Sequence, residues 1–140
     1  MTPPSSDLST DPSALTRTIT VDRARLVAYA DASGDQNPIH QDAEQARAVG
    51  LPDVIAHGMW TMGAALDVVT TYVGGDPGRV LSCQTRFTGM VVVPEGQTVE
   101  ILVEGTVTKT DEAAGTETIA ITATCGGDKV LGRCQAVVRV

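Results

Sequence analysis

The chain has 140 residues, of which 42% are hydrophobic and 3% aromatic, and its 10 Lys and Arg against 17 Asp and Glu give a formal charge of −7. This length and apolar content predict one folded domain with a substantial core and exclude an intrinsically disordered chain. No apolar run reaches the roughly 20 residues that span a bilayer, and no basic cluster could neutralise phosphates. We therefore expect neither membrane insertion nor nucleic-acid binding.

The N-terminal region divides into a tail and the start of a domain. Residues 1–14 are rich in Pro, Ser, Thr and Asp and lack an apolar period, which predicts a disordered tail. Residues 15–140 are expected to form a single domain, and the alternating pattern over residues 15–21 predicts its first strand. Asp22 then supplies an N-cap for a helix. The inward face of that helix carries Leu26, Tyr29 and Ala30.

A polar, turn-rich segment follows at residues 33–41. Pro38 removes a backbone donor and biases Asn37 away from helical conformation, so we expect a fixed loop. Asp42 with Gln45 three residues later resembles a capping box, which predicts a short helix that ends at Gly50.

The second half predicts one long helix and then strands. Residues 57–75 are apolar nearly all round, with Asp67 the only charged residue, so this helix is expected to be buried on most sides. A cluster of Gly, Asp and Pro ends it. Four strand-like segments follow, at residues 79–88, 97–110, 116–125 and 129–140. We therefore predict an α+β fold, with an antiparallel sheet wrapped around a long central helix.

The cysteines and histidines limit the chemistry. Cys83, Cys125 and Cys134 are an odd number at wide spacings, and no signal segment opens the chain, so we expect a reduced, cytoplasmic protein. Two histidines without a Cys pair at ligand spacing make a structural metal site improbable. We expect no metal and no other cofactor.

Asp35 and His40 are the acid and the imidazole of the 33–41 loop. A carboxylate beside a histidine is a common pair for moving protons to and from water near neutral pH. A turn carboxylate and a structural histidine are the alternative interpretation of the same two residues.

Gly58 lies where the apolar helix is expected to begin. Its backbone N–H has no partner inside the helix and, helped by the helix dipole, could hold negative charge that develops on an oxygen. Glycine would also let a substrate approach the backbone closely. The alternative is that Gly58 and Gly63 are small only so that the helix can pack against the sheet or a second subunit.

Taken together, three segments resemble the hydratase motif of the MaoC-like, hotdog-fold dehydratases. They are YADASGDQNPIHQD (residues 29–42), AVGLPDVIAHGMWTMG (residues 48–63) and RFT (residues 86–88). Residues 71–80 and 121–133 resemble more closely the B subunit of the mycobacterial-type (3R)-hydroxyacyl-ACP dehydratases. The resemblance extends over roughly residues 18–138.

The resemblance implies a hotdog fold and the reversible interconversion of a (3R)-3-hydroxyacyl thioester with the trans-2-enoyl thioester and water. By position, Asp35 and His40 match the catalytic pair, and Gly58 matches the glycine whose N–H binds the thioester oxygen. Asn37 matches a position expected to orient the loop or the catalytic water. The substrate would be an acyl-CoA or an acyl-ACP. Two hotdog protomers would pair, either as a homodimer or as a heterodimer with a sister subunit.

Two questions stay open at the level of the sequence. The first is whether the apolar helix lines an acyl tunnel; the residues available for it are Met59, Trp60, Met62 and Leu66, and core packing is the alternative. The second is the function class. A hotdog thioesterase would share the helix-terminus site, and a non-catalytic subunit of a heterodimeric dehydratase would share the fold. The intact Asp35 and His40 favour the dehydratase.

Overall fold

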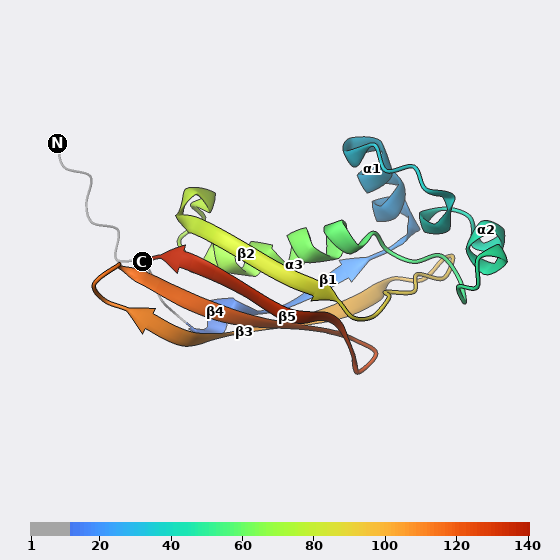
Figure 1. The fold of residues 1–140 in the computed structure, drawn as a ribbon. Helices are drawn as coiled ribbons and strands as arrows, with labels where there is room; N and C mark the ends of the chain where they lie inside the picture. The colour runs from blue at the N-terminus through green and yellow to red at the C-terminus, as the bar shows by residue number, and fades with distance from the viewer. Residues whose placement is uncertain (1–11) are drawn as a thin grey trace.

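The computed structural model of the protein describes residues 12–140 (Figure 1). The predicted tail therefore lies largely outside the described residues. Its last part is helical, because a short 3-10 helix, η1, covers Pro12–Leu15. Leu15, the last residue of η1, is buried in the core and only 1% exposed. None of the described helices is long and apolar enough to span a bilayer.

Five strands form one antiparallel sheet in the order β1-β3-β4-β5-β2 (Figure 1). The strands are β1 (Thr16–Val21), β2 (Val80–Phe87), β3 (Val99–Asp111), β4 (Thr116–Cys125) and β5 (Asp128–Arg139). All five begin and end within two residues of the predicted segments. The alternation of apolar and polar residues locates them well because one face of the sheet is buried and the other is not.

Helix α3 (Gly58–Tyr72) lies along the inner face of this sheet. Its buried residues join the core formed by the inward side chains of the strands; they are Thr61, Ala65, Val68, Val69 and Tyr72. The opposite side of the helix is open: Met59 is 60% exposed, and Asp67 pairs with Arg17 at 2.6 Å on the surface. The expectation that α3 is buried on most sides is therefore wrong in this single chain, because one sheet covers only one side of the helix.

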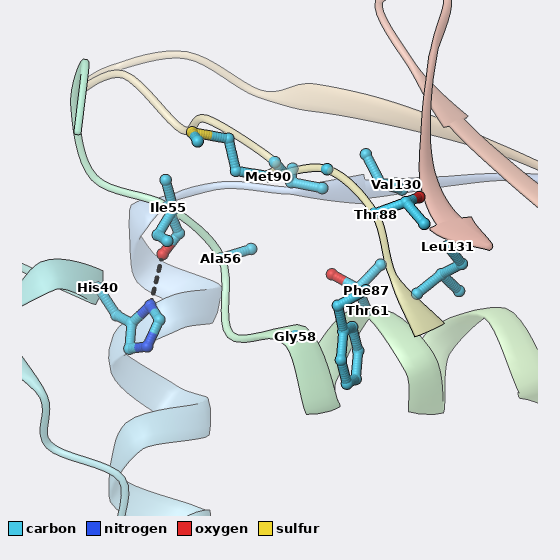
Figure 2. A pocket seen from close by; sticks show the side chains of 12 residues that line it. His40, Ile55, Ala56, Gly58, Thr61, Phe87, Thr88, Met90, Val130 and Leu131 are labelled. Carbon is cyan, nitrogen blue, oxygen red and sulfur yellow. Dashed lines mark hydrogen bonds between the residues drawn. The ribbon is translucent and has the colours of Figure 1, made fainter. Parts of the chain in front are cut away.

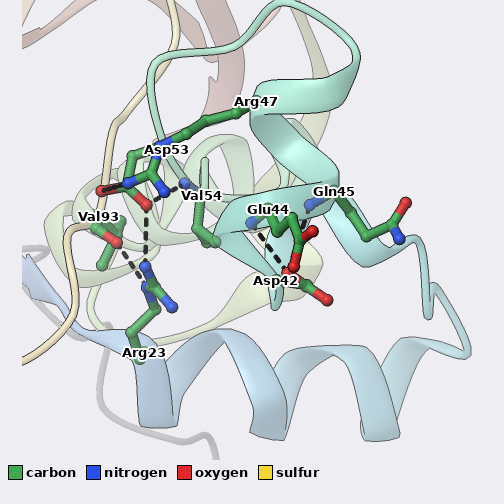
Figure 3. Close-up of polar contacts among 8 residues, drawn as sticks. All are labelled: Arg23, Asp42, Glu44, Gln45, Arg47, Asp53, Val54 and Val93. Carbon is green, nitrogen blue, oxygen red and sulfur yellow. Dashed lines mark hydrogen bonds and ion pairs between the residues drawn. The ribbon is translucent and has the colours of Figure 1, made fainter.

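Two short helices lie together at one end of the sheet (Figure 1). Asp22 caps α1 (Arg23–Ser33) by accepting the N–H of Arg25, as the sequence predicts. Asp42 caps α2 (Ala43–Ala48) by accepting the N–H groups of Glu44 and Gln45 (Figure 3). These caps fix where the intervening loop starts and ends.

A partly buried ion pair joins α1 to the segments beside the loop (Figure 3). The guanidinium of Arg23 donates to the carbonyl of Val93 at 2.6 Å and to Asp53 at 3.0 Å. Asp53 also accepts the N–H of Val54, and Arg47 of α2 lies 3.7 Å from its other oxygen. The Asp53 carboxylate therefore links α1, α2 and the segment that leads to α3.

The residues on either side of this ion pair form a short ladder. Val93 donates its N–H to the carbonyl of Val54 at 2.8 Å, and Ala56 donates to the carbonyl of Val91 at 2.9 Å. Ile55 bridges to Val92 between them. The start of α3 follows directly, so the ladder sets the position of the helix N-terminus.

Candidate active site

Side chains of the 33–41 loop accept hydrogen bonds from several of the loop's own backbone N–H groups. The Asp35 carboxylate accepts the N–H of Asn37 at 3.1 Å, and the Asn37 side chain accepts the N–H of Ile39 at 3.2 Å. Asn37 thereby caps a 3-10 turn, η2 (Pro38–His40). Of the two roles expected for Asn37, the structure provides an observation for the loop-orienting one.

His40 ends that turn with its ring buried, 7% exposed. Nδ1 lies 2.7 Å from the backbone carbonyl of Ile55 (Figure 2). Because a carbonyl oxygen can only accept, Nδ1 carries a hydrogen, which leaves Nε2 as the nitrogen that can give or take a proton. The ladder that holds Ile55 therefore also sets the tautomer of His40.

His57, the N-cap residue of α3, stacks on His40. The ring centroids are 3.8 Å apart and the planes differ by 24°. His57 is 2% exposed, and its Nε2 lies 3.1 Å from the backbone carbonyl of Asp35. Burial lowers the pKa of His57 below its ordinary value, the hydrogen bond to the Asp35 carbonyl opposes this, and the nearby His40 lowers it further.

These contacts bring the predicted pair together. One carboxylate oxygen of Asp35 and one ring nitrogen each of His40 and His57 all lie within 4.8 Å of one another. The Asp35 side chain is exposed, whereas both imidazoles are buried. An exposed carboxylate beside a buried imidazole can pass protons between water and a shielded substrate.

The same three side chains are the nearest approach to a metal site in the described part of the chain. Metal ligation requires lone pairs that converge on one point. The two rings are nearly parallel, and one nitrogen of each is engaged with a backbone carbonyl. The arrangement suits proton transfer better than chelation.

A cavity of about 390 Å³ opens beside His40 (Figure 2). His40 and Gly58 both line it. The rest of the wall is mainly apolar and comes from Ile55, Ala56, Thr61, Phe87, Thr88, Gly89, Met90, Val91, Val130 and Leu131. Asp35 and Asn37 do not line it. The cavity thus joins the imidazole to the helix N-terminus through an apolar space.

Gly58 is the first residue of α3, so its N–H has no acceptor within the helix. A Cβ placed on Gly58 would lie 3.0 Å from two ring carbons of Phe87. Close packing at this glycine, one of the two interpretations weighed from the sequence, is therefore present. The other interpretation requires a backbone N–H without a helix acceptor, and the position of Gly58 at the start of α3 provides it as well.

The four residues suggested for an acyl tunnel do not line this cavity. Trp60 and Leu66 pack against the core, Met62 is half-buried, and Met59 projects from the open side of the helix. The cavity wall comes instead from strand ends and loops, which helical periodicity could not indicate.

Sequence reasoning placed His57 at the helix start without giving its side chain a role. Its position directly before Gly58 was the only signal of a role for His57. The sequence could not indicate that its ring stacks on His40, which lies in another loop. The cysteines add no nucleophile at the cavity. Burial raises the pKa of both Cys134 and Cys125, which keeps these thiols protonated.

Known proteins resemble this chain over most of its length. A family model described as MaoC like domain matches residues 7–124. Enoyl-CoA hydratase 2, peroxisomal, from Arabidopsis thaliana is 39% identical over 74 residues, which are 52% of this chain and 24% of that protein. The chain spans only 5% to 26% of the length of the first three curated relatives.

Solved structures agree with the family match. A MaoC-like dehydratase is 36% identical with a TM-score of 0.85, and the alignment covers 89% of this chain and 38% of that chain. The (R)-hydratase from A. caviae involved in PHA biosynthesis is 25% identical with a TM-score of 0.72, covering 89% of this chain and 93% of that chain. The α+β hotdog fold expected from the sequence is confirmed.

Proposed function

Because this chain belongs to the MaoC-like domain family, we propose that it is a (3R)-3-hydroxyacyl-thioester dehydratase, equally an (R)-specific enoyl-thioester hydratase. One observation carries the proposal: His40 and Gly58 line the same apolar cavity, Gly58 is the first residue of α3, and the Asp35 carboxylate lies next to His40. Such a site offers a proton carrier at one wall and an oxyanion donor at the other. The substrate is the thioester of CoA or of an acyl carrier protein.

In the hydration direction, Asp35 orients a water molecule at C3 and takes one of its protons as the C–O bond forms. The electron pair of the C2–C3 double bond moves toward the thioester, and the enolate-like oxygen receives the Gly58 N–H. Protonated His40 delivers its Nε2 proton to C2. Asp35 then returns a proton to His40 across a separation of no more than 4.8 Å, which resets the site. Dehydration follows the reverse course.

The N-terminus of α3 strengthens the oxyanion donor. A helix of 15 residues carries a partial positive charge at its first turn, and Gly58 occupies that turn. The apolar walls of the cavity lower the local dielectric, so a hydrogen bond to a developing oxyanion is stronger there than in water.

We also propose that the active form contains two hotdog protomers. β2 lies at an edge of the sheet, and its Leu81 and Phe87 are 46% and 53% exposed. An unpaired strand edge with exposed apolar side chains favours association. Light scattering of the pure chain tests this, and a stable monomer would point to a sister subunit as the partner.

A reducing, cytoplasmic location fits the cysteines. Cys83 is exposed, Cys125 half-buried and Cys134 buried, and all three are free thiols. This distribution supports a protein that does not depend on disulfides.

The test is hydration of crotonyl-CoA, followed by loss of the enoyl-thioester absorbance, with Asp35→Asn and His40→Gln as the site variants. Glu112→Gln, an exposed carboxylate in the β3–β4 turn, is the matched control and should keep full activity. Both site variants should fold and lose at least about 100-fold in kcat/KM.

Two results would contradict the proposal. Release of free CoA instead of water addition would assign the site to a thioesterase. A folded chain that is inactive on short and long enoyl thioesters, alone and with a sister subunit, would make it a non-catalytic subunit.

A further inference from the structure

His57 contacts every group that the proposed reaction uses. Its ring stacks on His40 at 3.8 Å, its Nε2 lies 3.1 Å from the carbonyl of Asp35, and it is covalently joined to Gly58. Tyr29 packs against the same ring in a T-shaped arrangement, with the ring centroids 4.7 Å apart.

The hydrogen bonds assign opposite tautomers to the two histidines. Nε2 of His57 faces a carbonyl oxygen, so Nε2 carries the hydrogen and Nδ1 the lone pair. Nδ1 of His40 faces a carbonyl oxygen, so the hydrogen there lies on Nδ1. Nδ1 of His57 is buried with no hydrogen-bond partner among the described residues. Leaving a buried acceptor unpaired is unfavourable, and a core position would normally hold an apolar residue instead.

A capping role does not explain this histidine. His57 is the N-cap residue of α3, yet its side chain makes no hydrogen bond to the first turn of the helix. Proton transfer to the substrate does not explain a histidine at position 57 either. His57 does not line the cavity, and its Nε2 is engaged by the carbonyl of Asp35. What remains is its combined contact with His40 and Asp35.

We propose that His57 is a positioning residue that holds the His40 ring and the Asp35 loop in register with the Gly58 N–H. The stacked face orients His40, and the Nε2–H fixes the Asp35 backbone. A neutral ring lets His40 gain and lose its proton without charge repulsion from its neighbour. The catalytic meaning of this inference rests on the proposed function, but the geometry can be tested without turnover.

Three substitutions separate the two contacts. His57→Phe keeps an aromatic face and loses the donor, His57→Gln keeps a donor at a similar reach and loses the ring, and His57→Leu loses both. Tyr29→Phe is the control, because it preserves the edge contact on His57.

The first measurement is ¹⁵N NMR of the ring nitrogens, which is simple because the chain has only two histidines. At alkaline pH, where both rings are neutral, the wild type should show one ring in the Nε2–H tautomer and one ring in the Nδ1–H tautomer. The Ile55 carbonyl can select the His40 tautomer only while the ring is held against it. His40 should therefore keep its single tautomer in His57→Phe and Tyr29→Phe, where an aromatic face still holds the ring, and become a tautomer mixture in His57→Leu. An unchanged His40 tautomer in His57→Leu, or two rings of the same tautomer in the wild type, would overturn the proposal.

The second measurement is kinetic. His57→Leu should lower kcat by about 100-fold with little change in KM, because small misplacements of reacting groups have effects of that size. His57→Phe and His57→Gln should each recover part of the loss. In a His40→Gln background, His57→Leu should cost little more, since its effect passes through His40. Fully additive losses would identify a merely structural residue.

The two measurements keep the proposals apart. The expected NMR pattern in a wild type that hydrates no enoyl thioester would reject the proposed function and leave the positioning of His40 intact. Normal hydration with His40 unaffected by His57→Leu would reject only the positioning role.

Discussion

The phenyl ring of Phe87 lies against the Cα of Gly58, so that a Cβ at position 58 would be 3.0 Å from two of its ring carbons. Gly58→Ala should therefore push Phe87 into the cavity while leaving the backbone N–H in place. We expect a loss of about 10- to 100-fold in kcat/KM, since the thioester oxygen could no longer approach the N–H closely. Steady-state hydration kinetics check this. Full activity in Gly58→Ala would mean that the oxyanion is bound elsewhere.

Gly63→Ala is the matched control for Gly58→Ala, because it adds the same methyl group elsewhere in α3. A Cβ there would meet nothing within 4 Å in this chain. Gly63→Ala should raise the free energy of unfolding by about 1 kcal/mol, because alanine is the better helix former. Urea denaturation measures the change. Destabilisation together with a fall in the measured mass would instead place a second protomer against this side of α3.

The lowered pKa of His57 predicts a specific dependence of stability on pH. The unfolded chain titrates this ring near its ordinary value of 6.5, so below that pH the unfolded state binds more protons than the folded state. The contribution of His57 to the free energy of unfolding is therefore complete above about pH 6.5, and it decreases as the pH falls toward the pKa of the ring in the folded state. The ring faces His40, the Asp35 backbone and carboxylate, and Tyr29, all of which remain in His57→Phe.

Urea midpoints of the wild type and His57→Phe, taken between about pH 7.5 and about pH 5, test this dependence. The wild type should lose more stability than the variant over that interval. Parallel curves for the two proteins would show that His57 takes up no proton on unfolding.

The ion pair between Arg23 and Asp53 should stabilise the protein more than the one between Arg17 and Asp67. Asp53 is only 18% exposed and Asp67 is 61% exposed. Asp53→Asn should cost about 1–3 kcal/mol, because the Arg23 guanidinium loses a charged acceptor where solvent is scarce. Asp67→Asn should cost less than about 1 kcal/mol. Equal losses in urea titrations would contradict this ranking.

Arg133 lies in the left-handed backbone region with a φ of 47°. It falls within an irregularity of the β2–β5 pairing, between Gln84 and Arg86. Arg133→Gly should be more stable than Arg133→Ala by about 1 kcal/mol, since only glycine adopts this conformation without steric cost. Thermal unfolding of the two variants gives the comparison. Greater stability of the alanine variant would show that the strand straightens.

Local signals were sufficient for the elements and for part of the site. Asp22 and Asp42 cap their helices through contacts within three residues, and strand alternation depends on adjacent positions. The polar loop that carries His40 was recognisable because Pro38 and Asn37 act on their own neighbours. Features of this kind depend on residues that lie close together in the sequence.

The remainder depends on contacts between distant segments. The tautomer of His40 comes from a carbonyl 15 residues away, and the stacking partner of His40 begins a different helix. The cavity wall combines residues 55–56, 87–91 and 130–131, which share no periodic pattern. The open side of α3 was missed because apolar character indicates that a surface needs cover but not which subunit supplies it.

The strand order also determines when the protein can fold. β1 pairs with β3, and β2 pairs with β5, so α1, the His40 loop and α3 all precede the strands that complete the sheet. During synthesis these segments leave the ribosome before β3, β4 and β5 exist to cover them. Long-range pairing of this kind slows folding, and the apolar α3 is exposed to other chains meanwhile. Asp35, His40 and Gly58 are therefore made early, but the site becomes functional only when β5, which supplies part of its cavity wall, has been made.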